Sequence, residues 1–179
     1  RGCNSTVLHL GGGDTRKMHG LQWLVKNVWP RVRRISRDAR LLLAGRGSDD
    51  LSDPDNGVLG LGYVTDEVAF LSQGGLFVNP QMAGSGIKIK SLNAMAAGKT
   101  LVSTTNGLSG IVGTNGMHFL RADGPQKFSE AIVHCIKDEA YSKRLGEAAV
   151  KFVTDKYSLS AVVSNSVPQV QAFASGFKI

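Results

Sequence analysis

Short apolar runs alternate along the chain with stretches of helical periodicity. The runs are rich in leucine and valine and most of them end at glycine, asparagine or another polar residue, a pattern typical of buried β-strands. The predicted strands are Thr6–Leu10, Arg40–Ala44, Val58–Leu61, Leu76–Val78, Thr100–Thr104 and Met117–Arg121. Helices are predicted over Leu21–Ile35, from Asp66 with Thr65 as cap, and over Ile87–Ala97, Pro125–Lys137, Ala140–Thr154 and Leu159–Phe173. Pro30 is expected to kink the first helix rather than end it.

Strands that are apolar along their whole length and separated by helices indicate a parallel sheet covered on both faces. We therefore predict an α/β fold, a doubly wound, Rossmann-like parallel sheet of about six strands. The prediction is a single domain over residues 1–179, in which residues 155–179 form a C-terminal helix packing outside the core. In such a sheet ligands bind beyond the carboxyl ends of the strands, so the loops there are the candidate sites.

The composition adds a bias toward anionic partners. Of the 179 residues, 21 are Lys or Arg and 14 are Asp or Glu, which gives a net charge of +7, and 22 are glycine. This composition excludes a disordered chain, a collagen-like repeat and a disulfide scaffold, and no apolar run is long enough to span a membrane. Cys3 and Cys135 lack redox or metal-binding spacing, so we expect reduced thiols and a cytoplasmic location. The chain starts at Arg1, almost directly in a strand, and is expected to be a fragment.

Basic residues gather on and after the first predicted helix: Lys26, Arg31, Arg33, Arg34, Arg37 and Arg40. They could meet nucleic acid or an anionic membrane. However, neither stacking aromatics nor a nucleic-acid motif accompanies them, and cations near the carboxyl end of a helix also favour its dipole. We therefore favour a solvated face and predict no nucleic-acid partner, while peripheral contact with the inner membrane stays open.

Two phosphate-binding motifs are approached but not met. The segment Asn93–Thr100 lacks the first glycine of a P-loop, and it closes a helix and opens a strand, the reverse of the order a P-loop needs. Gly11–Gly13 follows the first strand as a dinucleotide fingerprint does, but Arg16 replaces the third glycine and Arg46 stands where an acidic ribose ligand is expected. A tight turn is the favoured interpretation, and NADP binding stays open as a weaker alternative.

Catalytic and metal-binding patterns are missing from the sequence. The four histidines, His9, His19, His118 and His134, show no metal-ligand spacing, and no nucleophile motif is present. We therefore predict no catalytic residue, no metal and no cofactor in this chain. His9 lies within an apolar strand and is expected to be a core residue.

The segment Gly84-Ser85-Gly86-Ile87-Lys88-Ile89-Lys90 follows a strand and is expected to open a helix. Glycine lets a ligand approach the backbone, and the first N–H groups of a helix have no partner within it. Lysines in the first turn oppose the helix dipole unless an anion binds there. The segment is thus a candidate site for a phosphate or diphosphate, although a glycine-rich turn with solvated lysines explains it equally well.

The segment Gly84–Thr104 resembles the donor-binding signature of the GT-B retaining glycosyltransferases, the group 1 family, which reads G-S-G-x-K-x-K-x-L-E-A-M-A-x-G-x-P-V-V-S-T. The resemblance extends to Gly20–Val32, Leu43–Arg46, Gly62–Val64 and Tyr157, and so covers nearly the whole chain. It implies the second of two Rossmann-like domains, the one that binds a nucleotide-diphosphate (NDP) sugar. A missing N-terminal domain would supply the catalytic histidine and the site for a glycan or lipid-linked acceptor, so the isolated chain is expected to be inactive.

The same resemblance implies which residues bind the donor. The amides of Ser85, Gly86 and Ile87, with Lys88 or Lys90, would hold the diphosphate, and Tyr63 and Val64 would border the base. Asn93 stands at the position that binds the ribose hydroxyls. The remaining candidate binding residues lie in the first two strand–helix loops, namely Gly12, Gly13, Arg16 and Arg46. The loop Thr104–Gly107 would lie near the donor as well.

The sequence departs from the family pattern in three ways. Asn93 replaces the glutamate that binds the ribose hydroxyls, and an amide lacks the charge and bidentate acceptance of a carboxylate. Ser85 replaces a glutamate that contacts the donor sugar in many members. Asp14 and His19 stand near the positions of a basic pair.

Two hypotheses follow from these departures. The first is the donor half of a retaining glycosyltransferase that builds surface polysaccharide or a related glycan. The second is a catalytically degenerate nucleotide-binding or interaction domain of the same fold. An Asn93→Glu variant should bind nucleotide clearly more tightly under the first hypothesis. The base, sugar, acceptor and oligomeric state are left open.

Overall fold

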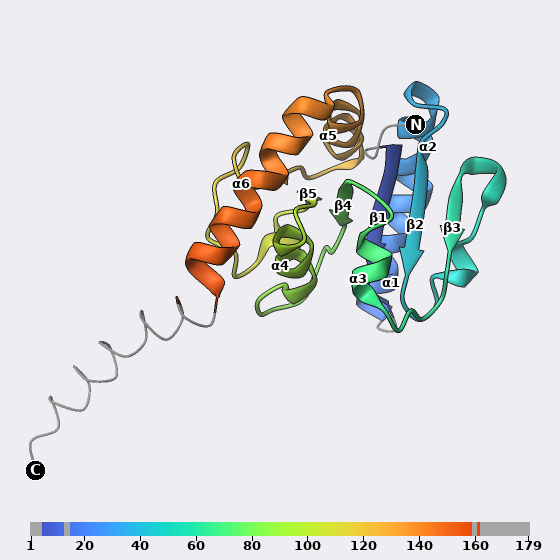
Figure 1. The fold of residues 1–179 in the computed structure, drawn as a ribbon. Helices are drawn as coiled ribbons and strands as arrows, with labels where there is room; N and C mark the ends of the chain where they lie inside the picture. The colour runs from blue at the N-terminus through green and yellow to red at the C-terminus, as the bar shows by residue number, and fades with distance from the viewer. Residues whose placement is uncertain (1–4, 13–14, 159–160, 162–179) are drawn as a thin grey trace, which may run out of the picture.

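Six parallel strands form one sheet in the order β3-β2-β1-β4-β5-β6 in the computed structural model, which describes residues 5–12, 15–158 and 161 (Figure 1). The strands are β1 (Thr6–Leu10), β2 (Arg40–Ala44), β3 (Val58–Gly60), β4 (Leu76–Asn79), β5 (Thr100–Ser103) and β6 (Leu120–Arg121). Every neighbouring pair is parallel. The predicted doubly wound α/β fold is therefore confirmed.

The strands are joined by helices and short helical turns. The helices are α1 (Thr15–Trp23), α2 (Trp29–Ile35), α3 (Glu67–Leu71), α4 (Ile89–Ala96), α5 (Pro125–Lys137) and α6 (Glu139–Tyr157). A π-helical turn, η2 (Leu24–Val28), joins α1 to α2, and 3-10 turns lie at η3 (Asp49–Leu51), η4 (Pro54–Asn56) and η5 (Asn106–Leu108). None of the helices in the described part of the chain has the length and apolarity of a transmembrane span.

Successive strand residues pack on opposite faces of the sheet, which gives two hydrophobic layers. Val7 and Leu41 pack with α1, α2 and α5, whereas Leu8 and Leu42 pack with α3, α4 and α6. Figure 1 shows α3 on one face of the strands and the blue α1–α2 segment on the other. Each fully buried leucine or phenylalanine contributes about 1.5–3 kcal/mol, so both layers are needed for stability.

The first predicted helix is continuous but changes its hydrogen-bond pattern before Pro30. The N–H of Trp29 bonds the carbonyl of Leu24, five residues earlier, at the end of η2. Proline has no N–H, and its ring clashes with the carbonyl four residues before it. The helix accommodates Pro30 with a π-helical turn, the kind of local irregularity that accompanies bends in helices.

Several predicted boundaries are wrong, and the first helix begins at Thr15 rather than Leu21. Asp66 rather than Thr65 caps α3, because its Oδ1 accepts from the N–H of Ala69 at 2.8 Å. β6 begins at Leu120 rather than Met117, since the preceding residues close a turn in which the N–H of Gly116 bonds the carbonyl of Phe119. α6 extends over Glu139–Tyr157, longer than predicted at both ends. The predicted helix over 159–173, and with it the placement of 155–179 outside the core, lies mostly outside the described residues.

The predicted basic cluster lies toward the amino ends of the strands, away from their carboxyl ends. It occupies η2, α2 and the start of β2, and all of its members except Arg33 are exposed. Arg33 donates to the carbonyl of Ala39 at 3.1 Å and to the carbonyl of Arg37, so it stabilises the turn between α2 and β2. These cations are therefore remote from the strand ends where a ligand is expected.

Two residues of uncertain role in the sequence are core residues. His9 is buried and its Nδ1 bonds the carbonyl of Val78 at 2.8 Å, as predicted. Burial lowers the pKa of His9 to about 4. Burial raises the pKa of the Cys135 thiol to about 12, so this thiol is protonated at neutral pH. Cys3 lies outside the described residues.

The pKa of His9 predicts a loss of stability in mild acid. The unfolded histidine takes up a proton near pH 6.5 but the folded one only near pH 4, so the free energy of unfolding falls as the pH drops through this window. The loss due to His9 should reach about 3 kcal/mol. Urea unfolding at pH 7.5 and 4.5 should show a smaller pH dependence for His9→Gln than for the native chain. The exposed control His134→Gln should keep the native pH dependence of the free energy of unfolding. If His9→Gln shows the same pH dependence as the native chain, His9 is not the source of the loss.

Candidate functional site

A cavity of about 180 Å3 lies between the carboxyl ends of β1 and β4. It is lined by His9, Leu10, Gly11, Gly12, Asn79, Pro80, Gln81 and Lys90. From β1 and β4 the sheet extends in opposite directions, through β2 and β3 on one side and β5 and β6 on the other. Ligands of doubly wound sheets bind at this switch point. The switch-point cavity is therefore the candidate binding site.

Glycines in the first two loops allow close backbone contact beside this cavity. A Cβ on Gly12 would lie 2.4 Å from the carbonyl oxygen of Arg46, and one on Gly45 would lie 2.6 Å from that of Gly11. At positions 12 and 45 a side chain would collide with the backbone of the other loop, so both positions require glycine. The Arg46 side chain is exposed. Gly13 and the side chain of Arg16, both predicted binding residues, lie outside the described residues.

The glycine-rich segment forms a loop, because α4 begins at Ile89, two residues later than predicted. Ser85, Gly86 and Ile87 are exposed in this loop. Their N–H groups donate to no residue within the described part of the chain. Gly86 has a φ of 78° with open space around it, a backbone conformation that favours glycine.

Lys88 and Lys90 have different surroundings, although both belong to the same predicted phosphate-binding segment. Lys88 precedes α4 and is buried, and its Nζ donates to the carbonyls of Gly84 and Ser85 at 3.2 Å each. Lys90 lies in the first turn of α4, lines the switch-point cavity, and forms an ion pair with Glu67 of α3. Lys88 thus holds the loop together, and Lys90 is the lysine that a ligand in the cavity would meet.

Asn93 does not line the switch-point cavity. It is exposed on α4 and lines a groove of about 560 Å3 between α3 and α4, the α3–α4 groove. The other lining residues are Glu67, Val68, Leu71, Ser72, Ala96, Ala97 and Lys99. The ion pair of Glu67 with Lys90 connects the groove to the cavity.

Tyr63 and Val64, the predicted base-binding residues, follow β3, two strands away from β1. Tyr63 is 71% exposed, whereas Val64 is half-buried against the hydrophobic layer of α3, α4 and α6. The loop before them is held by Ser48, whose Oγ accepts from the N–H of Gly62 at 3.1 Å. The Tyr63 ring is therefore available at the carboxyl edge of the sheet.

A buried hydrogen-bond network around Asn79 supports the floor of the switch-point cavity. The Asn79 Nδ2 donates to Ser91 Oγ at 2.9 Å and to the carbonyl of Gly107 at 3.2 Å. Its Oδ1 accepts from the N–H of Gln81 at 3.3 Å. Ser103 Oγ donates to the Asn79 carbonyl at 3.1 Å. The Asn79 side chain thus ties the end of β4 to α4 and η5, while its backbone carbonyl bonds β5.

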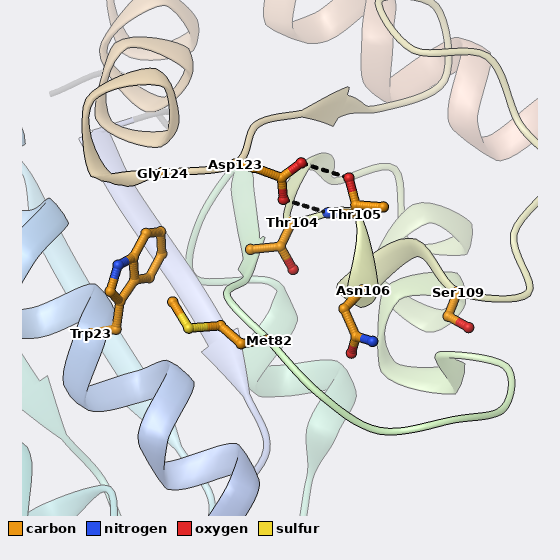
Figure 2. Close-up of a pocket in the computed structure, with 8 residues that line it drawn as sticks. All are labelled: Trp23, Met82, Thr104, Thr105, Asn106, Ser109, Asp123 and Gly124. Atoms are coloured by element: carbon orange, nitrogen blue, oxygen red, sulfur yellow. Dashed lines mark hydrogen bonds between the residues drawn. The ribbon is translucent and has the colours of Figure 1, made fainter.

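A second cavity, of about 590 Å3, is lined by residues from α1, the segment after β4 and the loops around β5 and β6 (Figure 2). We call it the Trp23 cavity, and its lining residues are Trp23, Met82, Thr104, Thr105, Asn106, Ser109, Asp123 and Gly124. Figure 2 shows the Asp123 carboxylate accepting from the N–H of Thr105 at 2.9 Å and from its hydroxyl at 2.6 Å. These bonds hold the pKa of Asp123 below its usual value, so the cavity carries an ionised carboxylate.

The Trp23 cavity adjoins the glycine-rich loop through Asn106. Its Nδ2 donates to the carbonyl of Gly84 at 3.1 Å, and its Oδ1 is buried without a hydrogen-bond partner in the described part of the chain. A Cβ on Gly110 would lie 2.9 Å from Cα of Ile87, so the next turn packs against the loop as well. The glycine-rich loop is therefore held by Asn106 and packed against the turn at Gly110.

Sequence reasoning missed three residues that shape the site: Asn79, Asn106 and Glu67. The sequence indicates Asn79 only as the end of a strand. Its position between a buried strand and a proline is the signal that its side chain is buried. Asn106 lies within the loop expected near the donor. Glu67 gave no signal, because its pairing with Lys90 depends on the packing of α3 beside α4.

Solved structures share this fold. The isolated C-terminal domain of LpcC, a glycosyl transferase group 1 family protein from Francisella tularensis, has a TM-score of 0.74 at 15% identity over 86% of each chain. HepE from Anabaena, solved in complex with UDP, has a TM-score of 0.76 at 16% identity, over 94% of this chain and 49% of that chain. At these identities the similarity shows the fold alone.

Sequence comparison identifies the family. An uncharacterised 44.6 kDa protein in the cps region of Klebsiella pneumoniae is 26% identical over 174 residues, which are 90% of this chain and 45% of the relative. The chain therefore spans less than half of that relative. Residues 4–138 match the sequence model of the glycosyl transferases group 1, and the chain belongs to this family.

Proposed function

We propose that this chain binds the NDP-sugar donor of a retaining glycosyltransferase. The observation that carries the proposal is the switch-point cavity, which Lys90 lines together with Gly11 and Gly12. A lysine and a close backbone approach are suited to a diphosphate, because the ammonium makes charge-assisted hydrogen bonds to phosphate oxygens. These bonds would also stabilise the nucleotide diphosphate as it leaves.

The surrounding residues suggest how the donor would lie. The base would meet the exposed Tyr63 ring beyond β3, and the ribose would lie toward Asn93 in the α3–α4 groove. The glycosyl end would lie by Ser85 and extend toward the Trp23 cavity, where Asp123 and several hydroxyl groups could accept and donate to sugar hydroxyls. The chain would thus need no metal or cofactor of its own to hold the donor.

The transfer reaction would need more than this chain, which spans 45% of its Klebsiella relative and 49% of HepE. In this proposal a further domain supplies the acceptor site, for a glycan or a lipid-linked acceptor, and the catalytic groups. HepE was solved with UDP, which makes UDP the first nucleotide to test. The place of the Klebsiella relative in a cps region supports polysaccharide synthesis.

Calorimetric titration of the 179-residue chain tests the proposal. We expect one of UDP, GDP and ADP to bind with a stoichiometry of one, and the matching nucleotide sugar to bind at the same site by competition. The control ligand is NADPH, which should not compete. If no nucleoside diphosphate binds at millimolar concentration, or NADPH binds in its place, the proposal is wrong.

A further inference from the structure

Glu67 places a carboxylate in the same groove as Asn93, the amide that this chain has where the family pattern has a glutamate. It is the first residue of α3, next to the capping residue Asp66. Its Oε1 accepts from Nζ of Lys90, which lies in the first turn of α4. A carboxylate from α3 therefore reaches α4 at the level of the switch-point cavity.

The ion pair of Glu67 and Lys90 lies where the switch-point cavity meets the α3–α4 groove. Lys90 lines the switch-point cavity, and Glu67 lines the α3–α4 groove together with Asn93. Lys90 and Asn93 are three residues apart on α4, so their side chains lie on the same face of the helix. The carboxylate of Glu67 is thus placed between the proposed diphosphate site and the proposed ribose site.

A bound diphosphate can displace Glu67 from Lys90. The two side chains are 42% and 39% exposed, so a ligand can reach both, and ion pairs this exposed are weak. A diphosphate offers several anionic oxygens within one group, and phosphate forms strong charge-assisted bonds with ammonium. Lys90 would therefore exchange its carboxylate partner for the diphosphate.

The released carboxylate is the strongest hydrogen-bond acceptor among the lining residues of the α3–α4 groove. An ionised carboxylate accepts through two oxygens and donates nothing, whereas the Asn93 amide has one uncharged acceptor oxygen. The two vicinal hydroxyls of a ribose donate in parallel, which matches the two carboxylate oxygens. Glu67 can therefore make the bidentate contact that Asn93 cannot.

We propose that Glu67 accepts the ribose hydroxyls of the bound nucleotide, and that Lys90 releases it for this role on binding the diphosphate. The inference rests on the proposed donor site and names a residue that gives that site its preference for ribose. The inference also reduces the role of Asn93. If Glu67 on α3 supplies the carboxylate for the ribose, the chain does not need one at position 93 on α4.

The test compares UDP with 2′,3′-dideoxyuridine diphosphate by calorimetry, with the GDP or ADP pair in their place if that nucleotide binds more tightly. The native chain should prefer UDP about tenfold or more, as expected for a hydrogen-bonded diol on a charged acceptor. In Glu67→Gln this preference should fall to about twofold or less, because UDP binding weakens. Binding of pyrophosphate should stay the same or tighten, since Lys90 loses its competing partner.

The opposite result has a clear signature. If Glu67 only masks Lys90, Glu67→Gln will bind UDP and the dideoxy nucleotide more tightly by the same factor, and the preference for ribose will not change. That outcome overturns the inference and leaves the proposed donor site intact. If the native chain binds no nucleoside diphosphate, the proposed function itself fails before any variant is compared.

Glu139→Gln is the matched control. Glu139 is the first residue of α6 and follows the capping residue Asp138, as Glu67 follows Asp66 on α3, so both variants remove the same charge from a helix start. The control should keep the native preference for ribose.

Asn93→Glu introduced into the Glu67→Gln chain should restore the preference, because Asn93 lines the same groove. In the native chain Asn93→Glu should add less. If the double variant binds pyrophosphate normally but shows no preference for UDP over the dideoxy nucleotide, the ribose does not lie in the α3–α4 groove.

Discussion

Replacing Lys90 with methionine should weaken the binding of UDP by about 30-fold, the equivalent of about 2 kcal/mol for lost hydrogen bonds to a charged group. Lys90 is the basic residue that lines the switch-point cavity, and methionine keeps the length of the side chain but removes the ammonium. The variant also leaves the Glu67 carboxylate without this partner, close to where the diphosphate would bind. Repulsion between them would add to the loss.

Titration with pyrophosphate separates the role of charge from that of shape. Lys90→Met should lose affinity for pyrophosphate by a similar factor, while its unfolding transition stays within about 0.5 kcal/mol of the native one, as for most surface substitutions. Lys143→Met, on an exposed part of α6, should bind as the native chain does. If Lys90→Met and the native chain bind pyrophosphate equally well, the diphosphate does not lie in the switch-point cavity.

Replacing Asn79 with leucine should lower the free energy of unfolding by about 3 kcal/mol and the melting temperature by about 10 °C. Leucine has a similar shape but no polar atoms. Ser91 Oγ and the Gly107 carbonyl would keep the hydrogen bond between them, but each would lose its bond to Asn79, and so would the N–H of Gln81. Each lost hydrogen bond contributes about 0.5–1.5 kcal/mol.

The same variant should lose nucleotide affinity, because the Asn79 side chain holds the start of α4 and η5 against the end of β4. Thermal unfolding and UDP titration of one preparation measure both effects. Asn27→Leu is the control, since Asn27 lies on the exposed side of η2, and it should shift the melting temperature by no more than about 2 °C. A native-like melting temperature for Asn79→Leu would show that the network is dispensable.

The strands and the longer helices could be predicted because their signals are local. β1, β2 and α5 have the predicted bounds, since an apolar run or a 3.6-residue period is written in consecutive residues. The start of α4 was not predictable in this way. By composition Lys88 is compatible with the first turn of a helix, but in the structure it precedes α4 and bonds the carbonyls of Gly84 and Ser85.

The site was predicted as a set of loops rather than as a set of contacts. The sequence places Lys88 and Lys90 in one motif, but whether a side chain turns back to its own loop or into a cavity depends on neighbouring strands. The pairing of Glu67 with Lys90 joins residues 23 positions apart, and no spacing rule connects them. The sequence assigns Asn93 to the ribose hydroxyls but does not show that Glu67 lines the same groove.

The inward orientation of Lys88 has a thermodynamic consequence for the donor. Its bonds to Gly84 and Ser85, with that of Asn106 to Gly84, fix the loop from within and from η5 before a ligand arrives. Ordering a mobile loop on binding costs conformational entropy, and a preorganised loop avoids that cost. Donor binding here should therefore be driven by contact enthalpy with a small entropic penalty. Lys88 thus keeps the glycine-rich loop in an ordered conformation before the diphosphate binds.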